Sequence, residues 1–481
     1  MDPLAGRVAV EAFIDSGADR NTLGLLYGRR RIGKSTLLEA VTTARAGFYW
    51  EATRAESAVH LARLGEALGA RLGVGRLAFE TWEDALTRVL QLGASQPTPI
   101  VLDEFGCLIE SDPSVDSNVT SILGPAGRRA NPGQARLILC GSAIAMMRSL
   151  TAGEAPLRGR AGMELVMQPF DFRMACSQFG FDVDLDLAAR VYAVIGGVIG
   201  YATDMVDHDL PASLDDFDRW VSARVLSPAA TLHHEATTLM AEDPTLSTAS
   251  AAVHHSVLGA IANGAVTAGT IANRLRRSVS NLDPALKRLT AAGFVVRHDD
   301  PIRSQRPVYS LADPFLQFHY AILEPHGRLL RDRDPRSVWS RTLTATFDSR
   351  VRGPVFEEQA RAWVRRYASA ETLGGLPDHV GPSVVASNGN EWQLDVVVAA
   401  DRAAGAPSER TVLAIGEAKA GETVGHGHLH RLEQARATMG TRAHRARILL
   451  FASVFTPGLQ AEAARRPDLE LIDFDRLYHG E

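Results

Sequence analysis

The stretch Gly28–Ser35 reads GRRRIGKS, fits the pattern G-x-x-x-x-G-K-[ST] without a mismatch, and lies between an apolar run, Leu23–Tyr27, and a segment with helical character, Ser35–Ala44. Its glycines let the backbone curl so that several N–H groups point at one phosphate chain. Lys34 can then reach the β- and γ-phosphates, and the Ser35 hydroxyl can hold magnesium. The stretch therefore predicts a loop for a nucleoside triphosphate with magnesium, and ATP is the expected nucleotide. The residues expected to contact it are Gly28, Arg29, Arg30, Arg31, Ile32, Gly33, Lys34, Ser35 and Thr36.

Acidic residues end a second apolar run, Pro99–Leu102, in the sequence PIVLDEF. Asp103 is placed to orient the magnesium, directly or through water, and Glu104 is placed to polarise the attacking water. Read alone, the run could be a buried strand that merely ends in acids. Its combination with the phosphate loop favours triphosphate hydrolysis, with Lys34 and Glu104 as catalytic residues.

A third apolar run, Arg136–Cys140, is followed by Gly141 and Ser142. The Ser142 hydroxyl could sense the γ-phosphate, although a tight turn that needs small residues would look the same. Arg158 and Arg160 follow where an arginine could neutralise charge on the γ-phosphate, within the chain or across subunits. Surface arginines are common, so the alternative of two ordinary surface residues stays open.

Strands that alternate with helices dominate the first third of the chain. Besides the runs above, Phe48–Trp50 is a strand candidate, and residues 185–245 carry apolar residues at helical spacing. This alternation predicts an α/β fold with a parallel sheet and crossover helices. A chain of 481 residues is too long for one core, so two to four domains are expected.

Composition and charge exclude several classes of protein. The hydrophobic content of 46% and the charged content of 22% are ordinary for a globular chain. A net charge of -5 argues against an overall basic surface, although a local basic patch can be hidden in that sum. Cys107, Cys140 and Cys176 have neither zinc nor disulfide spacing, which favours a reducing compartment. The sequence has no secretory signal and no apolar run long enough to span a bilayer, so we expect a cytoplasmic protein without membrane contact.

A change of pattern at residues 249–312 predicts a winged helix. Three helices, Val253–Ile261, Ala268–Leu275 and Val279–Ala292, precede two strands, Phe294–Arg297 and Val308–Leu311. Basic residues are concentrated in this stretch, namely Arg274, Arg276, Arg277, Lys287, Arg288, Arg297, Arg303 and Arg306. They could neutralise phosphates while the third helix enters the major groove of DNA. A lid or a protein-contact module is the alternative.

A third pattern begins near Val355. Strands are expected at Gln393–Val398, Val412–Gly416 and Arg447–Phe451, with a helix near His430–Met439 and turns at Asn388–Asn390 and Ala403–Ser408. His426, His428 and His430 form H-x-H-x-H, but no cysteine or acid stands at ligand spacing, so we expect them to be solvent-exposed.

The strands of this last part carry a second acidic constellation. Asp395 lies on one strand, and Glu417 and Lys419 form E-A-K at the end of the next. Two carboxylates and an amine at one sheet edge could hold magnesium and activate water. Glu357 and Glu358, on a preceding helix, could complete the metal site. The alternative is a binding domain of the same shape that does not cleave anything.

Four segments, GRRRIGKS, VLDEF, LCGS and PLRGR…QPFDF, together resemble the archaeal-type ATPases of the AAA+/STAND group. The resemblance continues through Gly196–Tyr201, similar to the family's GG-x-P-x-Y segment with Ile199 in place of proline, and through Asp313–Tyr320, similar to DPFLRFWY. It departs at Phe13–Gly17, a poor match to the family's phenylalanine, arginine and acid, on a helix expected to be shortened. How the base of the nucleotide would be bound therefore stays open. The C-terminal set resembles the PD-(D/E)xK nucleases and the nuclease-shaped last domain of the same ATPases.

Together these features predict a P-loop ATPase core at residues 1–180, a helical lid at 181–248, a winged helix at 249–312 and a PD-(D/E)xK nuclease-like domain at 313–481. The first hypothesis is an ATPase that acts on DNA, with Lys34, Glu104, Asp395, Glu417 and Lys419 as catalytic residues. Its magnesium ligands would be Ser35, Asp103, Glu357, Asp395 and Glu417. The alternative is a STAND-type signalling ATPase whose last domain only binds a partner. A homo-oligomer is compatible with both hypotheses.

Overall fold

The first sheet is parallel throughout and has the strand order β2-β3-β4-β1-β5. Its strands are β1 (Thr22–Tyr27), β2 (Phe48–Glu51), β3 (Thr98–Asp103), β4 (Ala135–Gly141) and β5 (Ala161–Val166). The expectation of an α/β fold with a parallel sheet is confirmed. The sequence indicates the first four strands because their apolar runs are buried. It does not reveal β5, an edge strand in which only Leu165 is buried and the other residues are exposed or partly buried.

Helices cover both faces of this sheet in the computed structural model, which describes residues 3–243, 245–246, 250–303, 306–387, 390–401 and 410–481. They are α1 (Pro3–Ile14), α2 (Lys34–Ala44), α3 (Ser57–Leu72), α4 (Trp82–Leu90), η1 (Gln91–Gly93), α5 (Phe105–Ser111), α6 (Val115–Leu123), α7 (Pro125–Ala130) and α8 (Ile144–Ser149). Successive strand residues face opposite sides, so Leu26 packs in the core beneath α1 and α2, and Leu25 in the core beneath α3 and α4. The helix before the first strand, expected to be shortened, is α1. α1 has 12 residues, and Phe13 near its end packs against Gly24.

A helical segment follows the first sheet. It contains α9 (Phe172–Phe179), α10 (Leu185–Ile195), the π-helix η2 (Tyr201–Met205), α11 (Leu214–Val221), the π-helix η3 (Ser222–Leu226) and α12 (Thr231–Glu242). Three further helices, α13 (Ala251–Ala262), α14 (Ala268–Leu275) and α15 (Val279–Ala291), lead into an antiparallel hairpin of β6 (Val295–His298) and β7 (Val308–Leu311). The helices and strands expected at residues 249–312 are thus present in the expected order.

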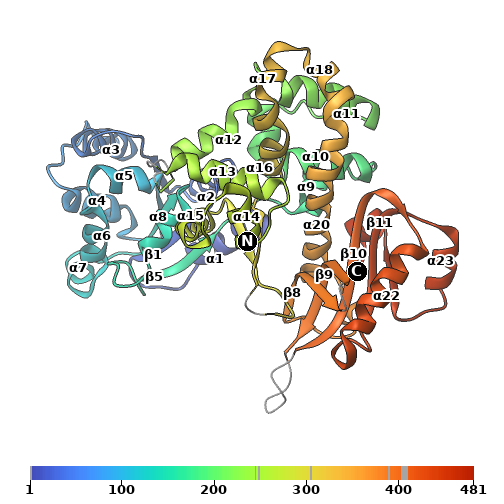
Figure 1. Cartoon of the computed structure of the whole chain (residues 1–481). Helices are drawn as coiled ribbons and strands as arrows, with labels where there is room; N and C mark the ends of the chain where they lie inside the picture. Colours follow the sequence, from blue (N-terminus) through green and yellow to red (C-terminus); the bar gives the residue numbers. More distant parts are fainter. Residues whose placement is uncertain (1–2, 244, 247–249, 304–305, 388–389, 402–409) are drawn as a thin grey trace.

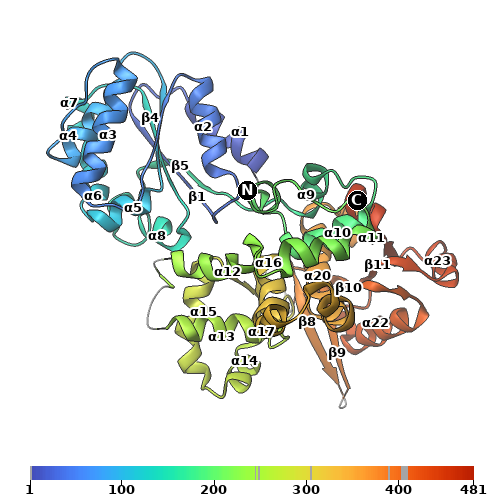
Figure 2. The same cartoon turned by 90° about the horizontal axis from the view of Figure 1, so that it is seen from above.

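A run of helices connects the hairpin to the second sheet. Its members are α16 (Pro314–Phe318), η4 (His319–Leu323), α17 (Glu324–Asp332), α18 (Pro335–Val338), η5 (Trp339–Leu343), α19 (Thr344–Phe347), η6 (Asp348–Arg352), α20 (Gly353–Arg366) and α21 (Ala370–Leu373). Asp313 caps the first of them by accepting the N–H of Phe315. An aromatic cluster of Phe217, Trp339 and Phe347 packs this run against α11. α16 and α20 lie between the two sheets in both views, whereas α17 and α18 stand at the top of Figure 1, beyond both sheets (Figure 1, Figure 2).

The second sheet is mixed and has the order β12-β11-β10-β9-β8. Its strands are β8 (His379–Ser387), β9 (Asn390–Ala400), β10 (Thr411–Val424), β11 (Arg447–Phe455) and β12 (Leu469–Ile472), of which β8, β9 and β10 are antiparallel and β10, β11 and β12 are parallel. The sequence does not reveal β8, because Gly381 and Pro382 interrupt it, although an edge strand tolerates proline. The turn expected at Ala403–Ser408 lies outside the described residues, as do positions 388 and 389 of the turn expected at Asn388–Asn390.

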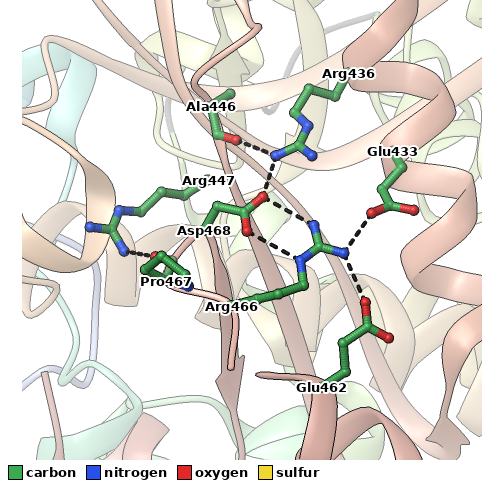
Figure 3. Close-up of polar contacts among 8 residues, drawn as sticks. All are labelled: Glu433, Arg436, Ala446, Arg447, Glu462, Arg466, Pro467 and Asp468. Atoms are coloured by element: carbon green, nitrogen blue, oxygen red, sulfur yellow. Dashed lines mark hydrogen bonds and ion pairs between the residues drawn. The ribbon is translucent and has the colours of Figure 1, made fainter. Parts of the chain in front are cut away.

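Helices α22 (His426–Thr438), η7 (Gly440–Arg442), α23 (Pro457–Ala463) and α24 (Phe474–His479) complete the chain. Arg466 connects α22, α23 and the segment before β12, as Figure 3 shows. Its guanidinium contacts Glu433 of α22 at 2.7 Å, Glu462 of α23 at 2.9 Å and Asp468 before β12 at 3.0 Å. Hydrogen bonds from Arg466 and Arg436 lower the pKa of Asp468 to about 2, against the effect of partial burial. Among the helices that the structure describes, none is long and apolar enough to cross a membrane.

Candidate functional site

The loop Gly28–Ser35 joins β1 to α2 with the geometry that phosphate binding needs. A Cβ on Gly28 would lie 2.4 Å from the carbonyl oxygen of Met167, so only glycine fits there. Gly33 has φ +87°, in the left-handed region, and caps the N-terminus of α2. Lys34 is 6% exposed and donates to the carbonyl oxygen of Arg29 at 2.7 Å. Burial lowers the pKa of the Lys34 ammonium.

The two acids expected beside this loop lie at the end of β3. The carboxylate of Asp103 accepts the Tyr49 hydroxyl at 2.7 Å and the N–H of Glu104 at 2.8 Å. Burial alone would raise the pKa of Asp103, but hydrogen bonds from Cys140, Ser35, Tyr49 and the Glu104 N–H outweigh it and lower the value. Asp103 is therefore a carboxylate within reach of Ser35. No sequence signal points to Tyr49, which lies on β2, the strand paired with β3.

Glu104 and Ser142 are brought together from neighbouring strands. Glu104 has φ +48°, a left-handed conformation that turns its side chain out of the strand direction. The Ser142 hydroxyl follows β4 and lies 2.9 and 3.1 Å from the two carboxylate oxygens of Glu104. The predicted sensor of the γ-phosphate thus contacts the predicted base directly.

The residues at this edge fit a magnesium ion that keeps most of its ligands as water and phosphate oxygens. Mg²⁺ in such sites takes one or two protein oxygens, and Ser35 with Asp103 would provide them. Ser35 and Thr36 are exposed at the first turn of α2. Across the described ranges, no three His, Cys, Asp or Glu residues are grouped so that they could hold a metal ion by themselves.

The three arginines of the loop are held by acids from distant elements. The sequence predicts these residues among the nucleotide contacts, and in the structure each of their side chains forms an ion pair. The pairs are Arg29–Asp313 at 2.8 Å, Arg30–Glu242 at 3.1 Å and Arg31–Glu235 at 2.8 Å. Arg29 also lies over the ring of Phe294, 5.7 Å from its centroid. Two of these acids lie on α12 and one caps α16, so the loop is fastened to the helical segment by its own side chains.

The segment Gly196–Tyr201 packs directly against the loop. The N–H of Gly200 donates to the carbonyl oxygen of Arg31 at 2.9 Å, and a Cβ on Gly200 would lie 2.8 Å from the Cβ of Arg31. A Cβ on Gly197 would lie 1.8 Å from the carbonyl oxygen of Phe170. Ile199 approaches Gly33. The two glycines are therefore required by close backbone approach.

Arg158 and Arg160 are not brought to the loop of their own chain. Arg160 directly precedes β5, and Ala161 pairs with Leu23 near the start of β1, whereas the phosphate loop follows the other end of β1. About five residues of strand separate the two places, or roughly 15 Å. Both arginines are exposed and donate to nearby carbonyl oxygens, those of Gly153 and Pro156. Nucleotide contact within one chain is therefore wrong for Arg160, and the prediction stands only for contact across subunits.

The basic residues of α14 and α15 form one exposed face. Arg276, Arg277, Lys287 and Arg288 are exposed, and Lys287 pairs with Asp283 at 2.7 Å. Arg274 donates to the carbonyl oxygen of Asn263. We call this set the α15 face. It is the part of the predicted winged helix that is open to a polyanion.

The turn of the hairpin is not open in the same way, because it is docked on the second sheet. Asp300 is 5% exposed and accepts the Ser383 hydroxyl of β8 at 2.8 Å. Arg410 donates to the carbonyl oxygen of Pro301 at 3.1 Å, and Ile302 packs against the core of the second sheet. The turn residues Asp300, Pro301 and Ile302 of the predicted wing are therefore covered by the second sheet.

Asp395, Glu417 and Lys419 converge where β9 and β10 diverge. Asp395 is 7% and Glu417 1% exposed. The Lys419 ammonium lies 3.0 Å from Glu417 Oε1 and 3.8 Å from Asp395 Oδ2, which also accepts the N–H of Ala418 at 3.0 Å. Arg431 of α22, which the sequence gave no reason to select, forms an ion pair with the same oxygen of Glu417. We call these four residues the C-terminal set.

The C-terminal set leaves one position for a further ligand. Glu417 Oε2 is buried and accepts no hydrogen bond from the residues that the structure describes. An orphaned carboxylate oxygen beside Asp395 fits a cation that takes its other ligands from water and phosphate. Lys419 and Arg431 both form ion pairs with Glu417, however, so they would compete with a metal ion for this carboxylate.

Glu357 and Glu358 have opposite environments although they are neighbours on α20. Burial and the charge of Asp395 raise the pKa of Glu357 to about 7. Burial would also raise the pKa of Glu358, but Arg361 and other cations lower it to about 2. Arg361 lies 2.8 Å from Glu358, and Arg365 pairs with it as well. Glu357 thus belongs to the surroundings of the C-terminal set, and the expectation for Glu358 is wrong because arginines hold its carboxylate.

The three histidines of H-x-H-x-H lie on the first turns of α22. His426 contacts Glu462 at 3.0 Å and His428 lies 3.7 Å from Glu422. His426 and His430 are exposed, as expected, and His428 is partly buried.

No family model matches the chain. It is 26% identical over 309 residues to the curated uncharacterized protein MJECL04 of Methanocaldococcus jannaschii, a match that covers 63% of this chain and 64% of that protein, less than two thirds of its length. The Walker-type ATPase PABY2304 of Pyrococcus abyssi superposes with a TM-score of 0.50 at 18% identity, over 67% of this chain and 96% of that chain. The chain therefore shares its fold with that protein over the superposed part. The ORC2 protein of Aeropyrum pernix is similar at a TM-score of 0.42 and 16% identity, over 68% of this chain and 92% of that chain.

Proposed function

We propose that the chain binds ATP with magnesium at Gly28–Ser35 and hydrolyses it. The observation that carries this proposal is the convergence of Lys34, Asp103 and Glu104 at the carboxyl edge of the first sheet. Lys34 is placed to neutralise the β- and γ-phosphates, and Asp103 with Ser35 is placed to hold the magnesium that offsets developing charge. Glu104, fixed by Ser142, is placed to orient and deprotonate the attacking water.

Lysine usage supports these roles. Only three of the 51 Lys and Arg residues are lysines, namely Lys34, Lys287 and Lys419. Arginine therefore provides nearly all positively charged side chains of the protein. Two of the three lysines, Lys34 and Lys419, lie in the candidate sites. A compact ammonium approaches a phosphate or a carboxylate pair differently from a planar guanidinium. Lysine at both positions is consistent with chemistry that arginine cannot replace.

The test is an ATPase assay on the full chain and on three charge-preserving variants. Lys34→Arg is expected to lower hydrolysis at least about 100-fold, because the guanidinium cannot take the place of the buried ammonium. Lys287→Arg, on the exposed α15 face, is the matched control and should retain full activity. Lys419→Arg should retain ATPase activity as well. Equal turnover in Lys34→Arg and wild type would refute the proposal.

We propose further that the α15 face binds DNA and that the C-terminal set is nuclease-like. The acid on β9 and the E-x-K on adjacent β10, with the unpartnered Glu417 Oε2, support the cleaving form. Cleavage of plasmid and single-stranded DNA with magnesium or manganese should be lost in Asp395→Ala and in Lys419→Arg. If no nucleic acid is cut while ATP hydrolysis is intact, the domain is a binding module.

The ion pairs between the loop and the helical segment favour a second candidate, a nucleotide-dependent signalling switch. Because Arg29, Arg30 and Arg31 join the loop to α12 and α16, nucleotide could set the relative position of these elements. Small-angle scattering of the apo, ADP and ATP-analogue states should then give different envelopes and assembly sizes. Identical size and shape in all three states would exclude this candidate.

A further inference from the structure

A cleft of about 780 Å³ lies between the hairpin and the second sheet. Val308 and Tyr309 of β7 form part of one wall, and Lys419 and Gly421 of β10 form part of the opposite wall. Glu357, from the first turns of α20, lies at the base. The volume is in the range of pockets for small ligands, so a duplex cannot enter, whereas a short piece of single strand can.

This cleft connects the C-terminal set with the α15 face. One wall includes Lys419, which contacts both acids of the set. The opposite wall includes Tyr309, whose N–H donates to the carbonyl oxygen of Val266 at 2.7 Å and fixes the strand there.

The charges in the cleft are suited to a phosphodiester. Three acids line it: Asp348 lies 3.8 Å from Arg352, Glu357 lies 3.9 Å from Arg361, and Glu422 lies 3.7 Å from the imidazole of His428. Arg350 is exposed, also lines the cleft, and donates to the carbonyl oxygen of Asn263 at 3.4 Å. Within the described part of the chain it has no acidic partner. Its guanidinium is therefore available for a phosphate.

The walls also offer surface on which the base of a nucleotide can pack. Tyr309 is half-buried and offers a ring face, with apolar surface from Val266 and Val308 beside it. Successive bases of a single strand stack on such aromatic rings without regard to sequence. The hydrogen bond from Ser383 of β8 to Asp300 connects the hairpin, which supplies one wall, to the second sheet, which supplies the other.

We propose that this cleft binds single-stranded nucleic acid, with a base stacked on Tyr309 and the backbone passing Arg350 toward Lys419. The inference rests on the proposed nucleic-acid role of the C-terminal set and names its substrate as an unpaired strand. Duplex would bind the α15 face outside the cleft, and only a separated strand would reach Asp395 and Glu417.

The test compares fluorescence anisotropy of a labelled oligo(dT) of about 12 nucleotides with that of its duplex with oligo(dA), in EDTA, on the full chain. Tyr309→Ala should weaken oligo(dT) binding about 5- to 100-fold, the range expected for one stacked base, and Tyr309→Phe should restore it. Ser349→Trp fills the cleft from η6 and should have the same effect without touching β7. Both should bind the duplex within about twofold of wild type. Arg288→Ala is the matched control on the α15 face and should show the reverse preference.

Three outcomes would overturn the inference: equal loss of single strand and duplex in Tyr309→Ala, unchanged oligo(dT) binding in Ser349→Trp, or competition by an acidic peptide as effective as by oligo(dT). ATP hydrolysis by the same proteins separates the two proposals. If the cleft binds oligo(dT) but no variant or wild type hydrolyses ATP, the ATPase proposal fails and the cleft stands. Because EDTA prevents metal-dependent cleavage, the binding result does not depend on whether the C-terminal set cuts DNA.

Discussion

The hydroxyl of Ser142 donates to the carboxylate of Glu104, at 2.9 and 3.1 Å from its two oxygens. The two residues follow neighbouring strands, β4 and β3, so the contact spans the edge of the sheet at which a nucleotide is proposed to bind. A hydroxyl has one proton to donate, and here that proton is shared with the proposed base. Ser142 is therefore placed to set the orientation of Glu104.

Removing this hydroxyl tests the relationship. Ser142→Ala frees the Glu104 carboxylate, and we expect kcat for ATP to fall about tenfold because a hydrogen bond to a charged group is lost. ATP affinity should change little, because Ser142 does not belong to the loop. Ser142→Thr retains the hydroxyl and serves as the control. A loss of affinity with unchanged kcat would instead assign Ser142 to phosphate binding alone.

Two arginines of the loop provide a matched pair for stability. Glu235 is 2% exposed, and burial raises its pKa although Arg31 opposes this. Arg31→Ala leaves that carboxylate buried without its cation, which costs about 3 kcal/mol. Arg30→Ala breaks the half-exposed pair with Glu242 and should cost less than about 1 kcal/mol. Urea unfolding followed by fluorescence measures both values, and equal costs would show that the Arg31–Glu235 pair is not buried in solution.

Close packing at Gly200 predicts an effect on nucleotide affinity. An added Cβ would lie 2.8 Å from the Cβ of Arg31 and 3.0 Å from its carbonyl oxygen, so Gly200→Ala must shift the loop. We expect ATP affinity to fall about tenfold, since phosphate binding depends on loop geometry. Gly269→Ala on α14 is the control, because its added Cβ meets nothing within 4 Å. Isothermal titration with an ATP analogue compares the two variants, and unchanged affinity in Gly200→Ala would show that the loop accommodates the methyl group.

Local sequence signals account for most of the strands and most of the candidate residues, but not for what holds them. The apolar runs before Gly28 and Asp103 are visible because a buried strand must be apolar, and Asp395 and Lys419 are visible because each lies beside such a run. Tyr49, Arg431 and the acids that hold the loop arginines are not visible. Their roles depend on contacts between residues far apart in the chain, and an arginine-rich composition hides which arginine is paired. An edge strand such as β5 is also missed, because it has a neighbouring strand on one side only and is less buried and less apolar.

The docked hairpin predicts a difference between two adjacent acids. Asp300 accepts hydrogen bonds from the N–H groups of Ile302 and Arg303 and from Ser383, whereas Asp299 is exposed and pairs with Arg297. Asp300→Ala should lower stability by about 2 to 3 kcal/mol and should increase amide exchange in β8. Asp299→Ala should change neither by a measurable amount. Hydrogen–deuterium exchange resolves the two cases, and unchanged protection of β8 in Asp300→Ala would mean that the turn is not docked in solution.

Neighbouring acids on α20 predict opposite responses to pH. The folded pKa of Glu357 is raised to about 7 from 4.5, so folding favours its protonated form and this contribution is lost as pH rises from 4.5 through 7. Glu357→Gln stays neutral, and in EDTA it should match wild type near pH 4.5 and exceed its stability at pH 8 by about 1 to 3 kcal/mol. Glu358 has a folded pKa lowered to about 2, so its stabilising contribution is present above pH 4.5 and is lost only as pH falls toward 2. Glu358→Gln should therefore be destabilised at pH 5 and pH 8 alike. Denaturant unfolding compares the stability of each variant with that of wild type, at pH 4.5 and 8 for Glu357→Gln and at pH 5 and 8 for Glu358→Gln. A Glu357→Gln variant that gains no stability at pH 8 would mean that Glu357 is ionised freely beside Asp395.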